Sequence, residues 1–248
     1  MSAYEEFANW YNVFMEDIPY EKWHKFMLDC LEKYNIKVRN ICDLGCGTGT
    51  LTTLFANSNG GDIVGVDSSA DMLMVARDNA FKSEYDIFYV NQDITELELG
   101  AEFDFIYSSC DTMNYIIEDA DLLCGFKNIK EHLSDSGLFI FDMKTKYKFK
   151  EVFGDNIYAD QTDEAAYIWE NFYDDEEEIN EYEVTFFIKD EDGRYTKMVE
   201  NHYQRAYEDT TVRKLLEEAG LKIVDVYDDY SFKEPTATTE RLTYIVKK

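Results

Sequence analysis

The chain of 248 residues is 45% hydrophobic and 16% aromatic, which is enough to bury a full core and argues against intrinsic disorder. Its formal net charge of −28, from 52 acidic and 24 basic residues, argues against a nucleic-acid partner, because such binding draws on Lys and Arg and no basic run is present. We expect one α/β domain that carries an insertion, although two small domains would also fit the length.

The sequence shows no pattern that is typical of export or of a metal site. The first twenty residues contain Glu5, Glu6, Glu16 and Asp17 but no Lys or Arg, unlike a secretory signal, and no apolar run has membrane-spanning length. We therefore expect a soluble, cytoplasmic protein without a membrane partner. The five cysteines are odd in number and lack paired C-x-x-C spacing, so we expect neither a disulfide framework nor a metal site.

Residues 4–34 carry aromatic side chains at roughly helical spacing, which predicts two helices separated near Pro19. The second helix is expected to cover the first strand. Tyr11, Tyr20 and Trp23 belong to this aromatic set. Aromatic residues at helical spacing are most often part of a core, and contact with a ligand is the alternative.

A glycine-rich turn follows the first predicted strand, residues 41–44. The G-x-G-x-G turn and the amphipathic segment after it predict strand, loop and helix, and glycines let a ligand approach the backbone closely. Thr50 stands where the dinucleotide fingerprint has its third glycine. Asp43, directly before the turn, would repel a pyrophosphate but attract an ammonium group. The loop therefore suits a phosphate-free ligand with a cationic end.

Two further predicted strands also end in an acid. Residues 62–67 end at Asp67, about twenty residues after the glycines, where doubly wound folds place an acid that binds both ribose hydroxyls. Ser68 or Ser69 is expected to cap the next helix. Residues 87–92 form another apolar strand, which Asp93 follows. A surface, capping or loop role is the alternative for both acids.

The fourth strand, residues 103–108, runs into a cluster of small and polar side chains. In open α/β sheets, ligands bind at the carboxyl ends of strands beside the first one, where the connections diverge. We therefore expect four residues to lie near the ligand: Ser109, Cys110, Asp111 and Asn114. A helix over residues 119–133 and a fifth strand over residues 138–142 follow.

Residues 148–207 interrupt the alternation of strand and helix. Apolar residues at alternate positions around a D-G turn predict antiparallel hairpins. In the last strand Glu200, His202 and Gln204 share one face, while Arg205 lies on the other. His202 or Arg205 could orient a substrate or receive its proton, but a structural role is the more common one. A helix over residues 211–219 and two closing strands complete the chain.

The motif D-L-G-C-G-T-G over residues 43–49, with Asp67 and Asp93 in register, resembles the cofactor motifs of class I S-adenosylmethionine-dependent methyltransferases. The resemblance implies a Rossmann-like, doubly wound, mostly parallel sheet of seven strands, with the last strand between the fifth and sixth. It also implies a helical lid over residues 1–35 and a core over residues 36–147 and 208–248. An antiparallel cap, residues 148–207, would then cover the substrate pocket, as in small-molecule methyltransferases with a type 11 or type 25 domain.

The same resemblance implies roles for individual residues around S-adenosylmethionine and its product S-adenosylhomocysteine. Asp93 would bind the adenine amino group and Ile94 would pack on the ring, while the aromatic lid residues would face the sulfonium or adenosine. The implied cofactor-binding set is Tyr11, Tyr20, Trp23, Asp43, Gly45, Cys46, Gly47, Asp67, Ser68, Met72, Asp93, Ile94, Ser109 and Cys110. The candidates for catalysis on the acceptor side are Tyr11, Asp111, Asn114 and His202.

The function implied is transfer of a methyl group to an O, N or C nucleophile of a small-molecule acceptor. Two alternatives stay open at this point. One is a protein that binds S-adenosylmethionine or S-adenosylhomocysteine without catalysis. The other is an NAD-dependent oxidoreductase, which Thr50 and Asp43 disfavour.

Overall fold

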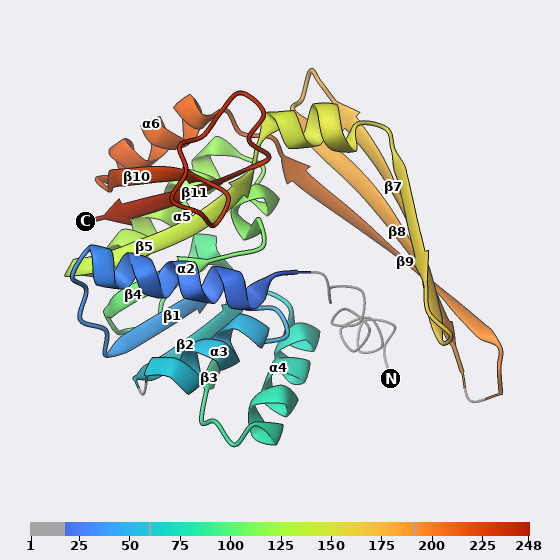
Figure 1. Ribbon diagram of the computed structural model, residues 1–248, viewed down its shortest axis with the longest axis horizontal. Coiled ribbons are helices and arrows are strands. Elements are labelled where there is room, and N and C mark those ends of the chain that lie inside the picture. The colour runs from blue at the N-terminus through green and yellow to red at the C-terminus, as the bar shows by residue number, and fades with distance from the viewer. Residues whose placement is uncertain (1–17, 60, 191) are drawn as a thin grey trace.

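The computed structural model describes residues 18–59, 61–190 and 192–248. Figure 1 shows a large sheet flanked by helices and a second, smaller sheet that extends away from it. The helix that we expect before Pro19, and Tyr11 with it, lie outside the described residues.

In the described part of the chain, the large sheet has seven strands in the order β10-β11-β5-β4-β1-β2-β3. β11 runs antiparallel to its neighbours β5 and β10, whereas the other pairs are parallel. This order confirms the doubly wound fold class, with the last strand between the fifth and sixth. The strands are β1 (Asn40–Leu44), β2 (Asp62–Asp67), β3 (Phe88–Asn91), β4 (Phe103–Ser108), β5 (Leu133–Lys144), β10 (Lys222–Asp228) and β11 (Arg241–Lys247).

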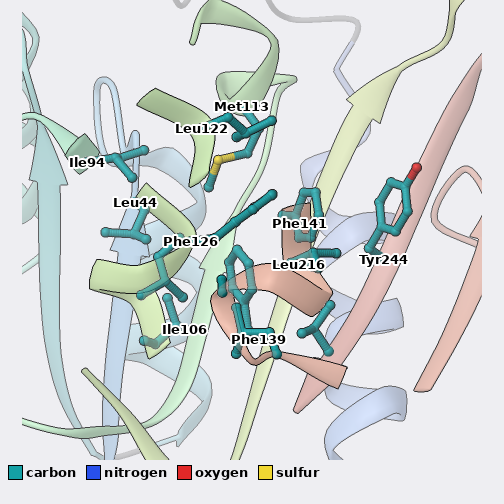
Figure 2. Close-up of a cluster of buried hydrophobic side chains, with 14 of the residues drawn as sticks. Leu44, Ile94, Ile106, Met113, Leu122, Phe126, Phe139, Phe141, Leu216 and Tyr244 are labelled. Atoms are coloured by element: carbon teal, nitrogen blue, oxygen red, sulfur yellow. The ribbon is translucent and has the colours of Figure 1, made fainter. Parts of the chain in front are cut away.

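Hydrophobic clusters fill both faces of the large sheet. Because side chains alternate along a strand, Phe139 and Phe141 of β5 enter one cluster, while Leu138 and Ile140 enter the other. Figure 2 shows the first cluster, which α5 and α6 cover; α2 and α3 cover the opposite face. The helices are α2 (Tyr20–Lys33), α3 (Thr50–Asn59), α4 (Ala70–Lys82), α5 (Asp119–His132) and α6 (Asp209–Ala219), with 3₁₀ turns η1 (Ile94–Glu96) and η2 (Thr112–Tyr115).

The second sheet, called here the cap sheet, follows a π-helical turn, η3 (Lys148–Phe153), and contains four antiparallel strands among the described residues. Gly193 adopts φ +79° in the turn before the last strand, as a D-G hairpin requires. Met72 of α4 packs against the apolar cluster of the cap sheet, to which Val184 and Phe186 belong. The strands are β6 (Ile157–Gln161), β7 (Ala165–Asp174), β8 (Ile179–Lys189) and β9 (Tyr195–Arg205).

None of the helices in the described ranges is both long enough and apolar enough to span a bilayer.

Candidate functional site

A cavity of about 770 Å³ lies between the carboxyl ends of the parallel strands and the inner face of the cap sheet. One wall comes from residues at or just after the carboxyl ends of β1 to β5, as the crevice rule for open α/β sheets predicts. The facing wall is largely aromatic and comes from β7 and β8, with His202 of β9. The described residues in the walls include Trp23, Gly45, Gly47, Asp67, Ser68, Met72, Asp93, Ile94, Cys110, Asp111, Thr112, Tyr115, Lys144, Tyr167, Trp169, Tyr182, Phe186, His202 and Arg241.

The glycine loop leaves β1 in a left-handed conformation that favours glycine, with φ +73° at Gly45 and +53° at Gly47. The N–H groups of Gly45 and Cys46 both donate to the carbonyl of Val66 in β2, at 2.8 and 3.0 Å. A Cβ on Gly45 would lie 2.4 Å from the Thr112 side chain, so η2 packs directly against the loop. A Cβ on Gly47 would have no described protein atom within 4 Å. Gly47 therefore presents open backbone to the cavity.

Asp67 joins the glycine loop to the start of α4. Its Oδ2 accepts the N–H of Gly47 and its Oδ1 accepts the N–H of Ser69, both at 2.8 Å. Burial raises the pKa of Asp67, although these two N–H donors act in the opposite direction. The Ser69 hydroxyl in turn accepts the N–H of Met72 at 3.2 Å, so Ser69 is the cap of α4.

Asp43 lies behind the glycine loop rather than in the cavity wall. Its Oδ2 accepts hydrogen bonds from the hydroxyls of Thr52, at 2.6 Å, and Tyr107, at 2.8 Å. Its Oδ1 is buried and has no hydrogen-bond partner in the part of the chain that the structure describes. Burial raises the pKa of Asp43 to about 7 in spite of the two hydroxyl donors.

Asp93 and Ile94 lie at the end of β3, on the cavity wall. Asp93 is exposed and caps η1, because its Oδ1 accepts both the N–H and the hydroxyl of Thr95, at 2.8 and 2.7 Å. Ile94 is buried, and its side chain also lies beneath Gly125 of α5. Since both bonds to Thr95 use Oδ1, the second oxygen of the Asp93 carboxylate can accept from a ligand beside an apolar surface.

Asp111 is the centre of a buried ionic network on the cavity floor. Its Oδ2 accepts from Lys144 at 2.8 Å and from Gln204 at 2.6 Å, and its Oδ1 accepts from Arg241 at 2.9 Å. Arg241 also pairs with the fully buried Asp142. Burial alone would raise the pKa of Asp111, but Lys144 and Arg241 outweigh it and the pKa is lowered. Both of these cations in the wall are thus already neutralised.

Asn114 is fully buried and connects the core to the cap sheet through backbone groups. Its Nδ2 donates to the carbonyls of Arg205, at 2.8 Å, and Lys144, at 3.2 Å, while its Oδ1 accepts the N–H of Lys144 at 2.9 Å. The three bonds hold η2, β5 and β9 together, and Asn114 does not line the cavity.

The comparisons with known proteins agree with this geometry. Residues 41–137 match a family model described as a methyltransferase domain. A candidate methyltransferase of Geobacillus sp. (strain WCH70) is 35% identical over 99% of this chain and 100% of its own. The crystal structure of an S-adenosylmethionine-dependent methyltransferase from Clostridium acetobutylicum superposes with a TM-score of 0.90, at 34% identity over 99% of both chains. This chain belongs to the S-adenosylmethionine-dependent methyltransferases.

The sugar N-methyltransferase KedS8 from Streptoalloteichus sp. shares the fold of this methyltransferase, with a TM-score of 0.77 and 16% identity over 96% of this chain and 93% of its own. Membership of the family makes the protein an enzyme that uses S-adenosylmethionine. It thereby excludes the two alternatives that the sequence left open, a non-catalytic binding protein and an NAD-dependent oxidoreductase.

The methyltransferase brings most of the expected site residues together. Those in the cavity wall are Trp23, Gly45, Gly47, Asp67, Ser68, Met72, Asp93, Ile94, Cys110, Asp111 and His202. Five others lie close behind the wall: Tyr20, Asp43, Cys46, Ser109 and Asn114. Tyr20, for example, accepts a weak hydrogen bond from the Cys110 thiol, at 3.9 Å. Tyr11 is outside the described residues.

Several wall residues were not singled out from the sequence. Tyr167, Trp169, Tyr182 and Phe186 line the methyltransferase's cavity from the cap sheet, and their alternate spacing was a signal that they share a face. No sequence pattern indicated Tyr115, because it occupies a short 3₁₀ turn. No pattern indicated Lys144 or Arg241 either, because Asp111, with which both form ion pairs, is far away in the sequence.

Proposed function

We propose that this enzyme transfers the methyl group of S-adenosylmethionine to an O, N or C nucleophile of a small molecule bound beneath the cap sheet. The observation that carries the proposal is the continuity of one cavity, which runs from the glycine loop and Asp67 to the aromatic inner face of the cap sheet. In this proposal the core is formed by residues 36–147 and 208–248, the roof by residues 148–207 and a lid by residues 1–35.

The residues of the cavity fit S-adenosylmethionine. The open side of Gly47 admits a ligand to the backbone, and the Asp67 carboxylate beside it would accept the ribose hydroxyls. Asp93 would accept the adenine amino group next to Ile94 and Met72. Asp43 lies behind Gly45 and Cys46, so its carboxylate would favour the ammonium end through its charge and not through direct contact.

The aromatic residue Trp23 is proposed to contact the cationic end of the donor. It lines the cavity, stacks on Tyr230 at 4.5 Å between ring centroids, and has a buried indole N–H without a partner among the described residues. The Arg241 guanidinium already lies over this ring, 5.3 Å from its centroid, so the proposed contact of Trp23 with the donor does not rest on cation–π attraction. Ser68, Ser109, Cys110 and Tyr20 complete the proposed donor pocket, and Tyr11 stays a candidate from the sequence.

The acceptor is proposed to lie against the cap sheet. S-adenosylmethionine supplies a methyl group on a positively charged sulfur, which leaves as a neutral thioether. The protein then needs to align the nucleophile, exclude water and remove a proton where the nucleophile carries one. His202 is the proposed acceptor-side base, while Asp111 and Asn114 act by holding the floor and η2 in place. KedS8, a sugar N-methyltransferase with the same fold, supports a small-molecule acceptor.

The proposal is tested in two steps. Isothermal titration calorimetry with S-adenosylhomocysteine measures donor-site binding, with NAD as the comparison ligand. Incubation with methyl-labelled S-adenosylmethionine and a panel of small hydroxyl, amine and carbon acceptors, followed by mass spectrometry, then identifies the product. We expect S-adenosylhomocysteine to bind and at least one small molecule to gain the label. Exclusive labelling of protein or RNA would contradict the proposal.

A further inference from the structure

A chain of hydrogen-bonding side chains connects η2 to the cap sheet across the cavity. The hydroxyl of Tyr115 lies 2.5 Å from the hydroxyl of Tyr182 and 3.4 Å from Nδ1 of His202. The other ring nitrogen of His202, Nε2, lies 3.2 Å from Oε2 of Glu200. Tyr115, Tyr182 and His202 line the cavity, whereas the Glu200 side chain is only 12% exposed.

The position of Glu200 favours one tautomer of His202. A carboxylate accepts hydrogen bonds, so the proton of the neutral imidazole belongs on Nε2 and the lone pair on Nδ1, which faces Tyr115. Carboxylate, imidazole and hydroxyl follow the same order where a histidine acts as a base towards a hydroxyl group. The contact of 3.4 Å is long for a hydrogen bond, as is common before a substrate tightens such pairs.

The position of Tyr115 places this chain beside the donor pocket. Tyr115 ends the short turn η2, and Thr112 at its start packs against Gly45 of the glycine loop. The ring of His202 stacks on Tyr182, with 4.9 Å between ring centroids, which holds the imidazole nearly parallel to the Tyr182 ring. Among the described residues, the titratable groups in contact with His202 are Glu200 of its own strand, Tyr182 of β8 and Tyr115 of η2.

The charges of the cavity restrict the acceptor. Lys144 and Arg241 are the lysine and arginine in the described walls, and both are paired with Asp111. Asp67 and Asp93 add negative charge to the same walls, and residues 1–17 contain no Lys or Arg. A phosphate group on the acceptor would find acids and no unpaired cation in the described walls, which is unfavourable in a cavity with aromatic walls.

We infer that the acceptor is a phosphate-free molecule with an apolar body and a hydroxyl or amine nucleophile, and that Tyr115 and His202 remove its proton. This inference rests on the proposed function. The lone pair of the acceptor oxygen or nitrogen forms the new bond to the methyl carbon, and the carbon–sulfur bond breaks with its electron pair remaining on sulfur. The acceptor proton passes to the Tyr115 oxygen, while the Tyr115 hydroxyl proton passes to Nδ1 of His202. Glu200 acts through His202 and is a positioning residue.

The tautomer of His202 can be tested without measuring catalysis. The chain has three histidines, and His132 serves as an internal control. Its Nδ1 donates to the Asn128 carbonyl and its Nε2 accepts the N–H of Leu99, so it has the opposite tautomer. In ¹⁵N NMR of the whole protein, we expect His202 to carry its proton on Nε2. Glu200→Gln should lose this preference without changing His132. A His202 proton on Nδ1 in the unmodified protein would overturn the inference.

The catalytic part is tested with Tyr115→Phe and Glu200→Gln, using the acceptor found in the panel. General base catalysis contributes about 10²–10⁴-fold, so Tyr115→Phe should lower kcat about a hundredfold or more and leave S-adenosylhomocysteine affinity unchanged. Tyr203 and Glu181 provide control positions of the same residue types, since the Tyr203 hydroxyl donates to the Glu181 carboxylate, at 3.1 Å, on the outer face of the cap sheet and without a histidine between them. Tyr203→Phe and Glu181→Gln should keep wild-type kcat. Unchanged kcat in Tyr115→Phe would overturn the inference.

The labelled product tests the acceptor class. Methylation of a hydroxyl or amine on a phosphate-free molecule is expected, whereas methylation of a carbon, a carboxylate, a thioether or a phosphate-bearing acceptor would overturn the inference. Both of these outcomes can be told apart from an error in the proposed function itself. If the proposed function is wrong, S-adenosylhomocysteine will not bind in calorimetry.

Discussion

The N–H of Gly47 donates to Oδ2 of Asp67 at 2.8 Å, so one carboxylate joins the glycine loop after β1 to the end of β2. The pair brings together two residues twenty positions apart in the sequence. It also aligns the open backbone of Gly47 with the acid proposed to bind the ribose, and the donor pocket depends on both.

Replacement of Asp67 by Ala should weaken S-adenosylhomocysteine binding by about tenfold or more. The substitution removes the acceptor proposed for the ribose hydroxyls, and a hydrogen bond to a charged group contributes about 1.5–3 kcal/mol. Isothermal titration calorimetry measures the change. Asp62→Ala, at the exposed opposite end of β2, is the control and should bind normally. Equal affinity of the two variants would mean that the ribose is bound elsewhere.

Gly47→Ala should abolish donor binding at a modest cost in stability. A residue with a side chain at φ +53° is strained by about 1–2 kcal/mol, and its Cβ would project into the cavity without touching the described protein atoms. Gly100→Ala is a matched control, because Gly100 has φ +63° and equally open surroundings outside this cavity. Urea unfolding should show similar losses for both variants, while calorimetry should show lost binding for Gly47→Ala alone. Retained binding in Gly47→Ala would contradict the proposed donor pocket.

Asp43 should make the fold less stable as the pH rises. Its folded pKa, about 7, lies above the ordinary value of about 3.9 for an unfolded aspartate, so burial penalises the ionised form. The resulting loss of folding stability is absent below about pH 4, increases between the unfolded and folded pKa values, and is complete above the folded pKa. Asp43→Asn should therefore gain stability relative to wild type across this range, by about 1.4 kcal/mol for each step of one pH unit between the two pKa values.

Urea unfolding at a series of pH values from about 5 to 8 tests this prediction through the slope of the stability difference. The changed hydrogen bonds to Thr52 and Tyr107 add an offset that does not vary with pH. Parallel stability curves for the two proteins would show that Asp43 does not titrate in this window.

Asp111→Ala should strongly destabilise the enzyme. It removes the shared partner of Lys144 and Arg241, whose side chains are 11% and 17% exposed, and breaking a buried ion pair costs about 3–5 kcal/mol. The control is Asp29→Ala, which breaks the surface pair with Lys25 and should change the unfolding free energy by less than about 1 kcal/mol. Similar losses in the two variants would show that the buried network does not support the cavity floor.

The core fold could be predicted because each of its signals is local. Apolar strands that end in an acid, the G-x-G-x-G turn and the Ser69 cap depend on neighbouring residues, and the structure has β1, β2 and α4 where these signals place them. The period-two pattern likewise predicted the cap sheet. Asp43 shows the limit of such reasoning, since its position in the motif did not reveal that its carboxylate turns towards Thr52 and away from the cavity.

The sequence by itself determined the α/β fold, the glycine loop and the acids at the strand ends, because backbone geometry and side-chain alternation act over a few residues. Only the tertiary structure decided which side chains meet across the cavity. Tyr115 reaches His202, and Lys144 reaches Asp111, because the strand order and the return of the cap sheet bring distant segments into contact. Such contacts arise from tertiary packing, and the residues that neighbour each partner in the sequence show no pattern that would predict them.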